Sequence, residues 1–340
     1  MPSGCQCNRK VVDCHPEQAS FAPRGIWASR ARCRAFCDTT IARLARFLIK
    51  TAPLATAIFA GCPSSVQLQS ASMKQLRSDE ADIVYEVAGS GSPIVLLHPF
   101  PANHELWRPC VNALETHYQL ILPDLRGHGD SGIGEGPATM PKHAADLARI
   151  LDTERIGKAT FVGVSIGGYI LFEFWRKHRA RVAALVLCNT KAAGETADSR
   201  AARLQAAADV LERGTEPFFE GLVTKLLGET TRRTRPDLVD GALRMMRKMS
   251  PEDVAWVQRG MAERPDSVET LKTINVPSLI VTGNEDQLTG VPEAEVLRRN
   301  IARSEMIVVA RAGHYSPWEQ PQEVGRILRQ FADRAGTGAR

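Results

Sequence analysis

The apolar positions of this chain form short, compact runs that are separated by longer amphipathic stretches. Residues 82–88 alternate between apolar and polar side chains, with the period of two that a half-buried strand shows. The other runs are apolar without alternation, at residues 94–97, 120–122, 160–162, 184–187, 279–281 and 306–309. Strands of this kind are buried on both faces, as in a parallel sheet that is covered by helices. The pattern therefore predicts a mostly parallel central sheet.

Helices are predicted between these strands, where apolar side chains recur every three or four positions. The predicted helices cover residues 142–152, 166–178, 293–301 and 322–332. Strands that alternate with helices along a chain are typical of a doubly wound α/β sheet.

One interval breaks this alternation. More than eighty residues without a predicted strand separate Asn189 from Pro277, and they are rich in Ala, Leu, Arg, Glu and Met, which favour helix. A structureless loop of that length is uncommon in a folded domain. We therefore expect an α/β core over residues 73–190 and 273–336, with residues 191–272 forming an inserted helical cap. Helices at the carboxyl ends of the strands would form a lid over a ligand crevice.

The first 72 residues differ from the rest in charge and in cysteine content. They hold nine of the 43 Lys and Arg residues and three of the 38 Asp and Glu residues, which leaves 34 basic and 35 acidic side chains in residues 73–340. The net charge of +5 therefore belongs to the N-terminal extension, and no nucleic-acid partner is expected. Six of the eight cysteines also lie there, without the usual zinc-binding spacing, so we expect no metal.

A basic segment at residues 43–50 is followed by an apolar run at residues 51–60 and then by Gly and Cys62. This order resembles a bacterial lipoprotein signal, although Phe59 stands where an aliphatic residue is usual. The run is too short to span a membrane.

The alternative to export at Cys62 is a cytoplasmic protein, and this is the location that we expect. Met73 stands immediately before a strand-like segment, where a compact enzyme could begin. Residues 1–72 are then an N-terminal extension, either disordered or involved in targeting.

The strongest chemical signal is Gly-Val-Ser-Ile-Gly at residues 163–167, which lies between the predicted strand 160–162 and an apolar helix. This strand–turn–helix context is the one that a G-x-S-x-G nucleophile elbow requires. Glycines two positions before and after Ser165 remove Cβ clashes in a strained turn. We therefore predict that Ser165 is a catalytic nucleophile.

A nucleophilic serine needs a general base, and the base needs an acid that orients it. In the chain order Ser, acid, His, the base is His314, directly after the last predicted strand. His178 is excluded because it ends the helix that follows the elbow. Asp286 is the predicted acid, and its neighbour Glu285 is the alternative.

Two backbone N–H groups are expected to stabilise an oxyanion at the substrate carbonyl. One belongs to Ile166, which follows the nucleophile. The other is predicted in the loop after residues 94–97, where Phe100 has an N–H but Pro99 and Pro101 do not. His98 in the same loop is expected to have a structural hydrogen-bonding role.

Residues 82–331 resemble the α/β-hydrolase superfamily. The sequence His-Pro-Phe-Pro at 98–101 is similar to its His-Gly-x-Pro oxyanion loop, with Pro99 in place of glycine, and residues 123–131 match its P-D-x-R-G-x-G-x-S turn. The resemblance is greatest to carboxylesterases and enol-lactonases. It implies the α/β-hydrolase fold, ester or lactone substrates, and neither a metal nor an organic cofactor.

Two groups of residues in the predicted cap are candidates for substrate contacts. The first is four methionines, Met245, Met246, Met249 and Met261, which pack as core or line an acyl tunnel. The second is five arginines, Arg232, Arg233, Arg235, Arg244 and Arg247, which form a solvated helix face or anchor an anionic substrate. Ordinary packing and solvation are the favoured interpretations.

The sequence therefore predicts a serine hydrolase that cleaves a small-molecule ester or lactone through an acyl-enzyme. A cofactor-free perhydrolase on the same scaffold is one alternative, because peroxide would replace water at the same intermediate. A ligand sensor or signalling protein with little turnover is another, since fold alone does not define function.

Overall fold

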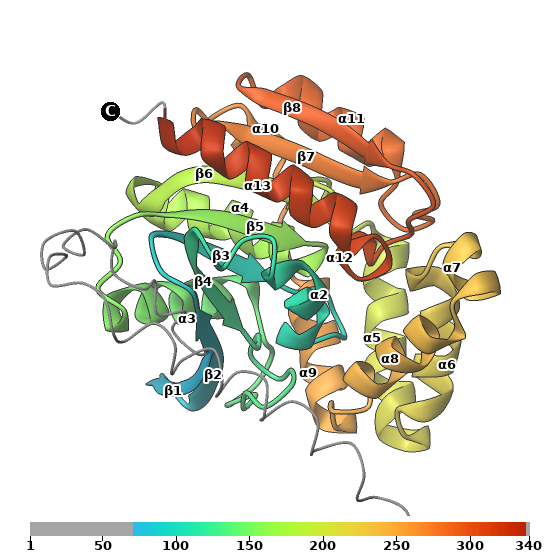
Figure 1. Cartoon of the computed structure of the whole chain (residues 1–340). Helices are drawn as coiled ribbons and strands as arrows, with labels where there is room; N and C mark the ends of the chain where they lie inside the picture. Colours follow the sequence, from blue (N-terminus) through green and yellow to red (C-terminus); the bar gives the residue numbers. More distant parts are fainter. Residues whose placement is uncertain (1–70, 338–340) are drawn as a thin grey trace, which may run out of the picture. The chain divides into compact units, whose positions relative to one another are not determined.

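The computed structural model describes residues 71–337, which fold around an eight-stranded sheet with the order β1-β2-β4-β3-β5-β6-β7-β8 (Figure 1). The strands are β1 (Ser72–Ser78), β2 (Ala81–Ala88), β3 (Ser92–Leu97), β4 (Tyr118–Pro123), β5 (Ala159–Val164), β6 (Val182–Cys188), β7 (Ser278–Gly283) and β8 (Ser304–Val309). All neighbours from β4 to β8 pair in parallel, and only β1 and β2 are antiparallel to their partners. The mostly parallel sheet is confirmed.

The strand β1 extends the sheet beyond the apolar runs. It pairs antiparallel with β2, and Met73 lies opposite Glu86. Met73 is therefore inside a strand, whereas the sequence pattern places it immediately before one. Most of β1 is exposed, which explains why it carries no apolar run.

Helices cover both faces of the sheet. On one face α3 (Met140–Thr153) packs against α4 (Ile166–His178), with α11 (Val291–Asn300) beside β7 and β8. On the other face α13 (Pro321–Thr337) lies beside a short helix, α2 (Arg108–Val111) (Figure 1). Three short elements complete the core: η1 (His104–Trp107), η2 (Arg179–Arg181) and α12 (Ser316–Glu319).

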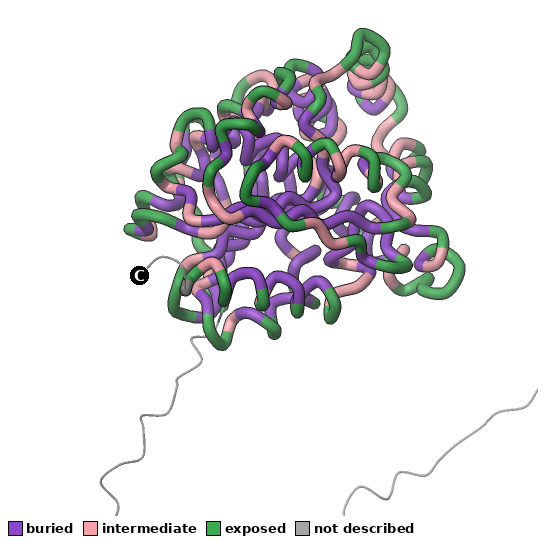
Figure 2. The backbone as a smooth tube through the Cα atoms, turned by 90° about the horizontal axis from the view of Figure 1, so that it is seen from above, coloured by how far each residue is buried: buried purple, intermediate pink, exposed green. Residues whose placement is uncertain are grey.

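The buried positions follow the apolar pattern of the sequence except at the edge strand β8, where Met306 and Ile307 are half-buried and Val308 is exposed. All six residues of β7 are buried, as are the last four of β3 and of β5, and Figure 2 shows the buried positions concentrated in the middle of the molecule. Burial on both faces of these strands is what their continuous apolar sequence predicts. The α/β-hydrolase fold expected from the sequence is confirmed, and the carboxyl ends of the strands are where its loops present polar side chains.

Between β6 and β7 the chain forms α5 (Ala197–Arg213), α6 (Glu216–Leu226), α7 (Glu229–Thr234), α8 (Pro236–Met246), α9 (Pro251–Ala262) and α10 (Val268–Leu271). The helices α5 to α8 lie at the right of Figure 1 and α9 lies below its centre, and α5 packs along α9. Ser250 and Asp253 form a reciprocal capping box that begins α9.

Within residues 71–337 no helix is both long and apolar enough to cross a membrane. The basic segment 43–50, the apolar run before Cys62 and the clustered cysteines lie outside the described residues.

Candidate active site

Ser165 occupies a sharp turn between β5 and α4. Its backbone has φ 54° and ψ −112°, a conformation that side chains other than glycine rarely adopt. The Ser165 N–H donates to the Cys188 carbonyl at 3.0 Å, and its own carbonyl accepts from the Thr190 hydroxyl at 2.8 Å. These bonds to the end of β6 hold the strained turn, so that the hydroxyl is presented at the carboxyl edge of the sheet.

The glycines of the elbow are required by close backbone approach. A Cβ on Gly163 would lie 2.5 Å from the carbonyl carbon of Gly167. A Cβ on Gly167 would lie 2.9 Å from the Cβ of Leu97 on β3. Both contacts are closer than real Cβ atoms show, so the helix α4 starts against the sheet only with glycine at both positions.

His314 and Asp286 meet at the same edge, from the loops that follow β8 and β7. The His314 Nδ1 atom lies 2.9 Å from Asp286 Oδ2 and 3.1 Å from Oδ1. Both side chains are almost completely buried. A proton on Nδ1 that is donated to the carboxylate leaves Nε2 unprotonated, which is the form that a general base needs.

Asp286 is held by several donors besides the histidine. Its carboxylate accepts from Asn189 Nδ2 at 2.9 Å, from the Thr289 hydroxyl at 3.0 Å and from the Leu288 N–H at 2.8 Å. Burial alone would raise the pKa of Asp286, but the charge of His314 and these hydrogen bonds outweigh it and hold the pKa far below its ordinary value. The carboxylate therefore stays ionised.

Glu285, the alternative acid, faces a different partner. Its carboxylate accepts from the Thr230 N–H at 2.8 Å and from the Thr230 hydroxyl at 2.5 Å, at the start of α7. The structure thus brings Asp286, and not Glu285, against His314.

The loop after β3 carries the predicted second oxyanion donor. His98 is neutral there, because Nδ1 donates to the Pro99 carbonyl at 2.9 Å and Nε2 accepts from the Leu125 N–H at 2.9 Å. Among the described residues, neither the Phe100 N–H nor the Ile166 N–H has a hydrogen-bond acceptor. Both groups are therefore free to bind an oxygen atom from a substrate.

The turn at 123–131 forms a buried polar network. Asp124 accepts from the His104 N–H at 2.8 Å and from the Asp130 N–H at 2.9 Å, and Arg126 forms an ion pair with Asp146 at 2.6 Å. None of these five residues lines the cavity over Ser165. Their contacts agree with the structural role that the family resemblance implies for this turn.

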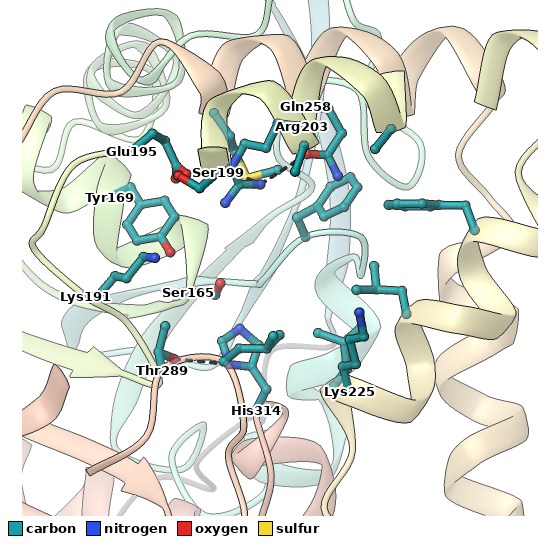
Figure 3. A pocket seen from close by; sticks show the side chains of 18 residues that line it. Ser165, Tyr169, Lys191, Glu195, Ser199, Arg203, Lys225, Gln258, Thr289 and His314 are labelled. Carbon is teal, nitrogen blue, oxygen red and sulfur yellow. Dashed lines mark hydrogen bonds and ion pairs between the residues drawn. The ribbon is translucent and has the colours of Figure 1, made fainter. Parts of the chain in front are cut away.

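A cavity of about 370 Å³ lies over the elbow, and Ser165 and His314 both line it (Figure 3). This volume is in the range of small-molecule sites. Much of the lining is apolar, from Phe100, Ala202, Ala206, Phe218, Leu222, Leu226, Met261 and Leu288. The polar lining consists of Tyr169, Lys191, Glu195, Ser199, Arg203, Lys225, Gln258 and Thr289.

The two groups of cap residues singled out in the sequence contribute little to this cavity. Of the four methionines only Met261 lines it, while the other three are buried in packing. None of the five arginines lines it, and Arg235 and Arg247 form exposed ion pairs with Asp237 and Glu216.

Sequence reasoning missed Asn189, Thr289 and Lys191. The segment around Asn189 is informative only for its lack of a carboxylate, which excludes it as the position of the acid. The Asn189 side chain donates to Asp286 because β6, which precedes Asn189, pairs with β7, which precedes Asp286. No local motif indicates it.

The mostly parallel sheet and the sharp turn at Ser165 are features of the α/β-hydrolase class. Comparison with known proteins agrees with this class. Residues 92–321 match the model of the alpha/beta hydrolase fold family, and the chain belongs to this family.

Relatives of several specificities are similar to this chain. The 3-oxoadipate enol-lactonase 1 of Acinetobacter baylyi is 28% identical over 238 residues, which cover 70% of this chain and 87% of the relative. A thermophilic esterase of Thermogutta terrifontis has a solved structure with a TM-score of 0.75 and 33% identity, covering 78% of this chain and 99% of the esterase. An enol-lactonase of Burkholderia xenovorans shares the fold, with a TM-score of 0.72, 22% identity and coverage of 76% and 100%.

Proposed function

We propose that this hydrolase-family protein is a serine hydrolase that cleaves a carboxylic ester or lactone, with Ser165 as nucleophile, His314 as base and Asp286 as acid. The observation that carries the proposal is the pair of close contacts between His314 Nδ1 and the Asp286 carboxylate, at 2.9 and 3.1 Å, in a cavity that Ser165 also lines. The relatives named above include an esterase and enol-lactonases, which supports ester or lactone substrates.

The arrangement supports acyl transfer in two steps. Ser165 attacks the carbonyl carbon while His314 Nε2 takes its proton, and the ionised Asp286 stabilises the imidazolium that forms. The N–H groups of Phe100 and Ile166 donate to the oxyanion. His314 then returns the proton to the leaving alcohol and activates a water molecule, which releases the acid and frees Ser165.

The helices between β6 and β7 complete the site in this proposal. Phe218, Leu222 and Leu226 of α6 line the cavity, as does Met261 of α9. We assign residues 191–272 as the cap and residues 73–190 and 273–336 as the catalytic core. The apolar cap surface excludes bulk water from the acyl group.

The first experiment is labelling of the full chain with a fluorophosphonate, read by intact mass. Wild type should gain one adduct and Ser165→Ala none, because only an activated serine reacts. Ser199→Ala is the matched control, since Ser199 lines the same cavity but belongs to the first turn of α5. It should label like wild type.

Hydrolysis is then measured on short-chain esters and lactones by acid release. Wild type should turn over at least one substrate of the panel, and Ser165→Ala should lose about 10³-fold or more in kcat. A folded wild-type protein that neither labels nor hydrolyses any ester or lactone would contradict the proposal.

A further inference from the structure

On one side of the cavity, positively charged side chains outnumber the carboxylates that they contact. The Glu195 carboxylate accepts from Arg264 Nε at 2.8 Å and lies 3.2 Å from Arg203 Nε. The Arg264 guanidinium also lies over the Tyr169 ring, 4.1 Å from its centroid. Among the described residues that line the cavity, Glu195 is the one carboxylate, and it is thus shared between two arginines.

Lys191 lines the same cavity. It is half-buried, and among the described residues it forms no ion pair or hydrogen bond. Burial and then the charge of Arg264 lower its pKa, and the shared Glu195 carboxylate only partly offsets this. Figure 3 shows Lys191 and Tyr169 on the same side of Ser165, with both polar ends directed into the cavity.

The balance of charge follows from these contacts. Arg203 and Arg264 share the Glu195 carboxylate. Lys191 contacts no carboxylate among the described residues, and Glu195 and Glu293 act on its charge only from a distance. Lys225 adds a further positive charge at the exposed edge of the cavity. An ammonium group without a counter-ion in direct contact, in partly dehydrated surroundings, attracts an anion more strongly than it would in water.

We propose that Lys191 and the Tyr169 hydroxyl bind a carboxylate of the substrate, so that the preferred esters or lactones carry a second, unesterified carboxyl group. This inference rests on the proposed function. Two donors match the two oxygens of a carboxylate. Burial raises the pKa of Tyr169 and outweighs the charge of Arg264 and the hydrogen bond with Ser165, so Tyr169 remains a hydroxyl donor. The apolar lining accepts the short carbon chain between the carboxylate and the scissile carbonyl.

The test compares substrates that differ only in this carboxylate. Monomethyl glutarate and methyl pentanoate have acyl groups of equal carbon number, and only the first is an anion. The acetate esters of 3-hydroxypropanoate and of propanol form the corresponding pair for the alcohol side. Wild type should prefer the anion of at least one pair by roughly tenfold or more in kcat/KM, since charge-assisted hydrogen bonds are the strong ones. The preference should fall as salt is added.

The variant is Lys191→Met, which keeps the length of the side chain and removes its charge. The ratio of kcat/KM for the anionic and neutral esters should fall about tenfold, mainly through KM for the anion. Lys272→Met is the matched control, because Lys272 pairs with Glu269 on the surface at α10 and does not line the cavity. Its ratio should equal that of wild type.

A second measurement needs no variant. The compounds 4-carbamoylbutanoate and pentanamide both place an amide at the reactive end, and only the first has a distal carboxylate. The anion should inhibit wild-type hydrolysis of methyl pentanoate with an inhibition constant at least tenfold lower.

The outcomes separate this inference from the proposed function. Hydrolysis of neutral esters with no preference for the anion in either pair overturns the inference and leaves the serine hydrolase intact. A preference that survives in a folded, fluorophosphonate-labelled Lys191→Met protein overturns it too. Absence of both labelling and hydrolysis in wild type overturns the proposed function, and the inference with it.

Discussion

Two adjacent carboxylates, Glu285 and Asp286, show how strongly the role of a residue depends on its direction. Asp286 points to His314, at 2.9 Å, whereas Glu285 points to Thr230 in α7. Both follow β7 in the same tight turn, and successive residues of such a turn project to different sides. A difference of one position therefore separates an acid that can orient a base from a carboxylate that joins the loop after β7 to the helix α7.

Replacement of Asp286 by Asn should lower kcat by roughly 10³- to 10⁴-fold, because an amide that donates to Nδ1 stabilises the wrong tautomer of His314. Steady-state hydrolysis of the best panel ester measures this. Glu285→Gln is the control and should lose less than about tenfold, since its carboxylate does not contact the histidine. Equal losses in the two variants would argue against Asp286 as the acid.

The site residues that could be predicted from the sequence are those whose neighbours in the chain form a recognisable pattern. Ser165 is marked by its glycines and His314 by its place after the last predicted strand. Asn189, Thr289 and Lys191 carry no such mark, because an amide, a hydroxyl or an ammonium group is common on any loop. Their contribution arises only where β6, β7 and the following loops converge.

At the scale of elements, the loop that carries His314 is fixed to the connection between α6 and α7. The His314 N–H donates to the Leu226 carbonyl at 2.8 Å. Glu319 on α12 accepts from the Gly313 N–H at 2.9 Å and from the Gly228 N–H at 2.8 Å. The inserted helices thus contact the backbone of the proposed base loop, and a shift of α6 or α7 would move His314.

Glu319→Gln tests this connection. The side chain is buried, and a glutamine offers one acceptor oxygen where the carboxylate offers two, so one N–H loses its partner. We expect the free energy of unfolding to fall by about 1–3 kcal/mol in urea titrations. We also expect kcat to fall with little change in KM, because the base loop loosens.

The control for this variant is Glu323→Gln, at an exposed position in the first turn of α13. Glu323 pairs with Arg326 on the surface, where such pairs contribute less than about 1 kcal/mol. If Glu319→Gln proved no more destabilising than Glu323→Gln, the contacts of Glu319 would not hold the loop.

At the scale of the whole molecule, three buried histidines link stability to pH. Burial lowers the pKa of His98 to about 4 and that of His143 to about 3, and it places the pKa of His128 well below the ordinary value. In the unfolded chain a histidine has a pKa near 6.5. As the pH falls from 6.5 towards 4, the unfolded chain binds protons that the folded chain does not. The contribution of these histidines to the free energy of unfolding is therefore complete above pH 6.5 and is lost progressively below it.

Urea unfolding at pH 7.5, 6 and 5 measures this loss. Each histidine should contribute a slope of up to about 1.4 kcal/mol per pH unit within the window. Glu86 and Glu319 act in the opposite sense, because burial raises the pKa of each, whereas Asp286, whose pKa is lowered, acts in the same sense as the histidines. His143→Leu should reduce the slope by roughly one proton, and a slope that does not change would contradict the assignment of His143 as a buried neutral group.

The sequence by itself determined the parallel sheet, the elbow at Ser165 and the order of the polar loops, because each depends on apolar periodicity or on residues close together in the chain. Only the tertiary structure decided which carboxylate meets His314 and that Asn189 and Thr289 hold that carboxylate. It also decided that Lys191 faces the cavity with no hydrogen-bond or ion-pair partner within residues 71–337. These contacts join loops from β6, β7, β8 and the inserted helices, and their geometry depends on the register and packing of the whole sheet. Side-chain direction at a loop is a long-range property, and no local pattern of residues encodes it.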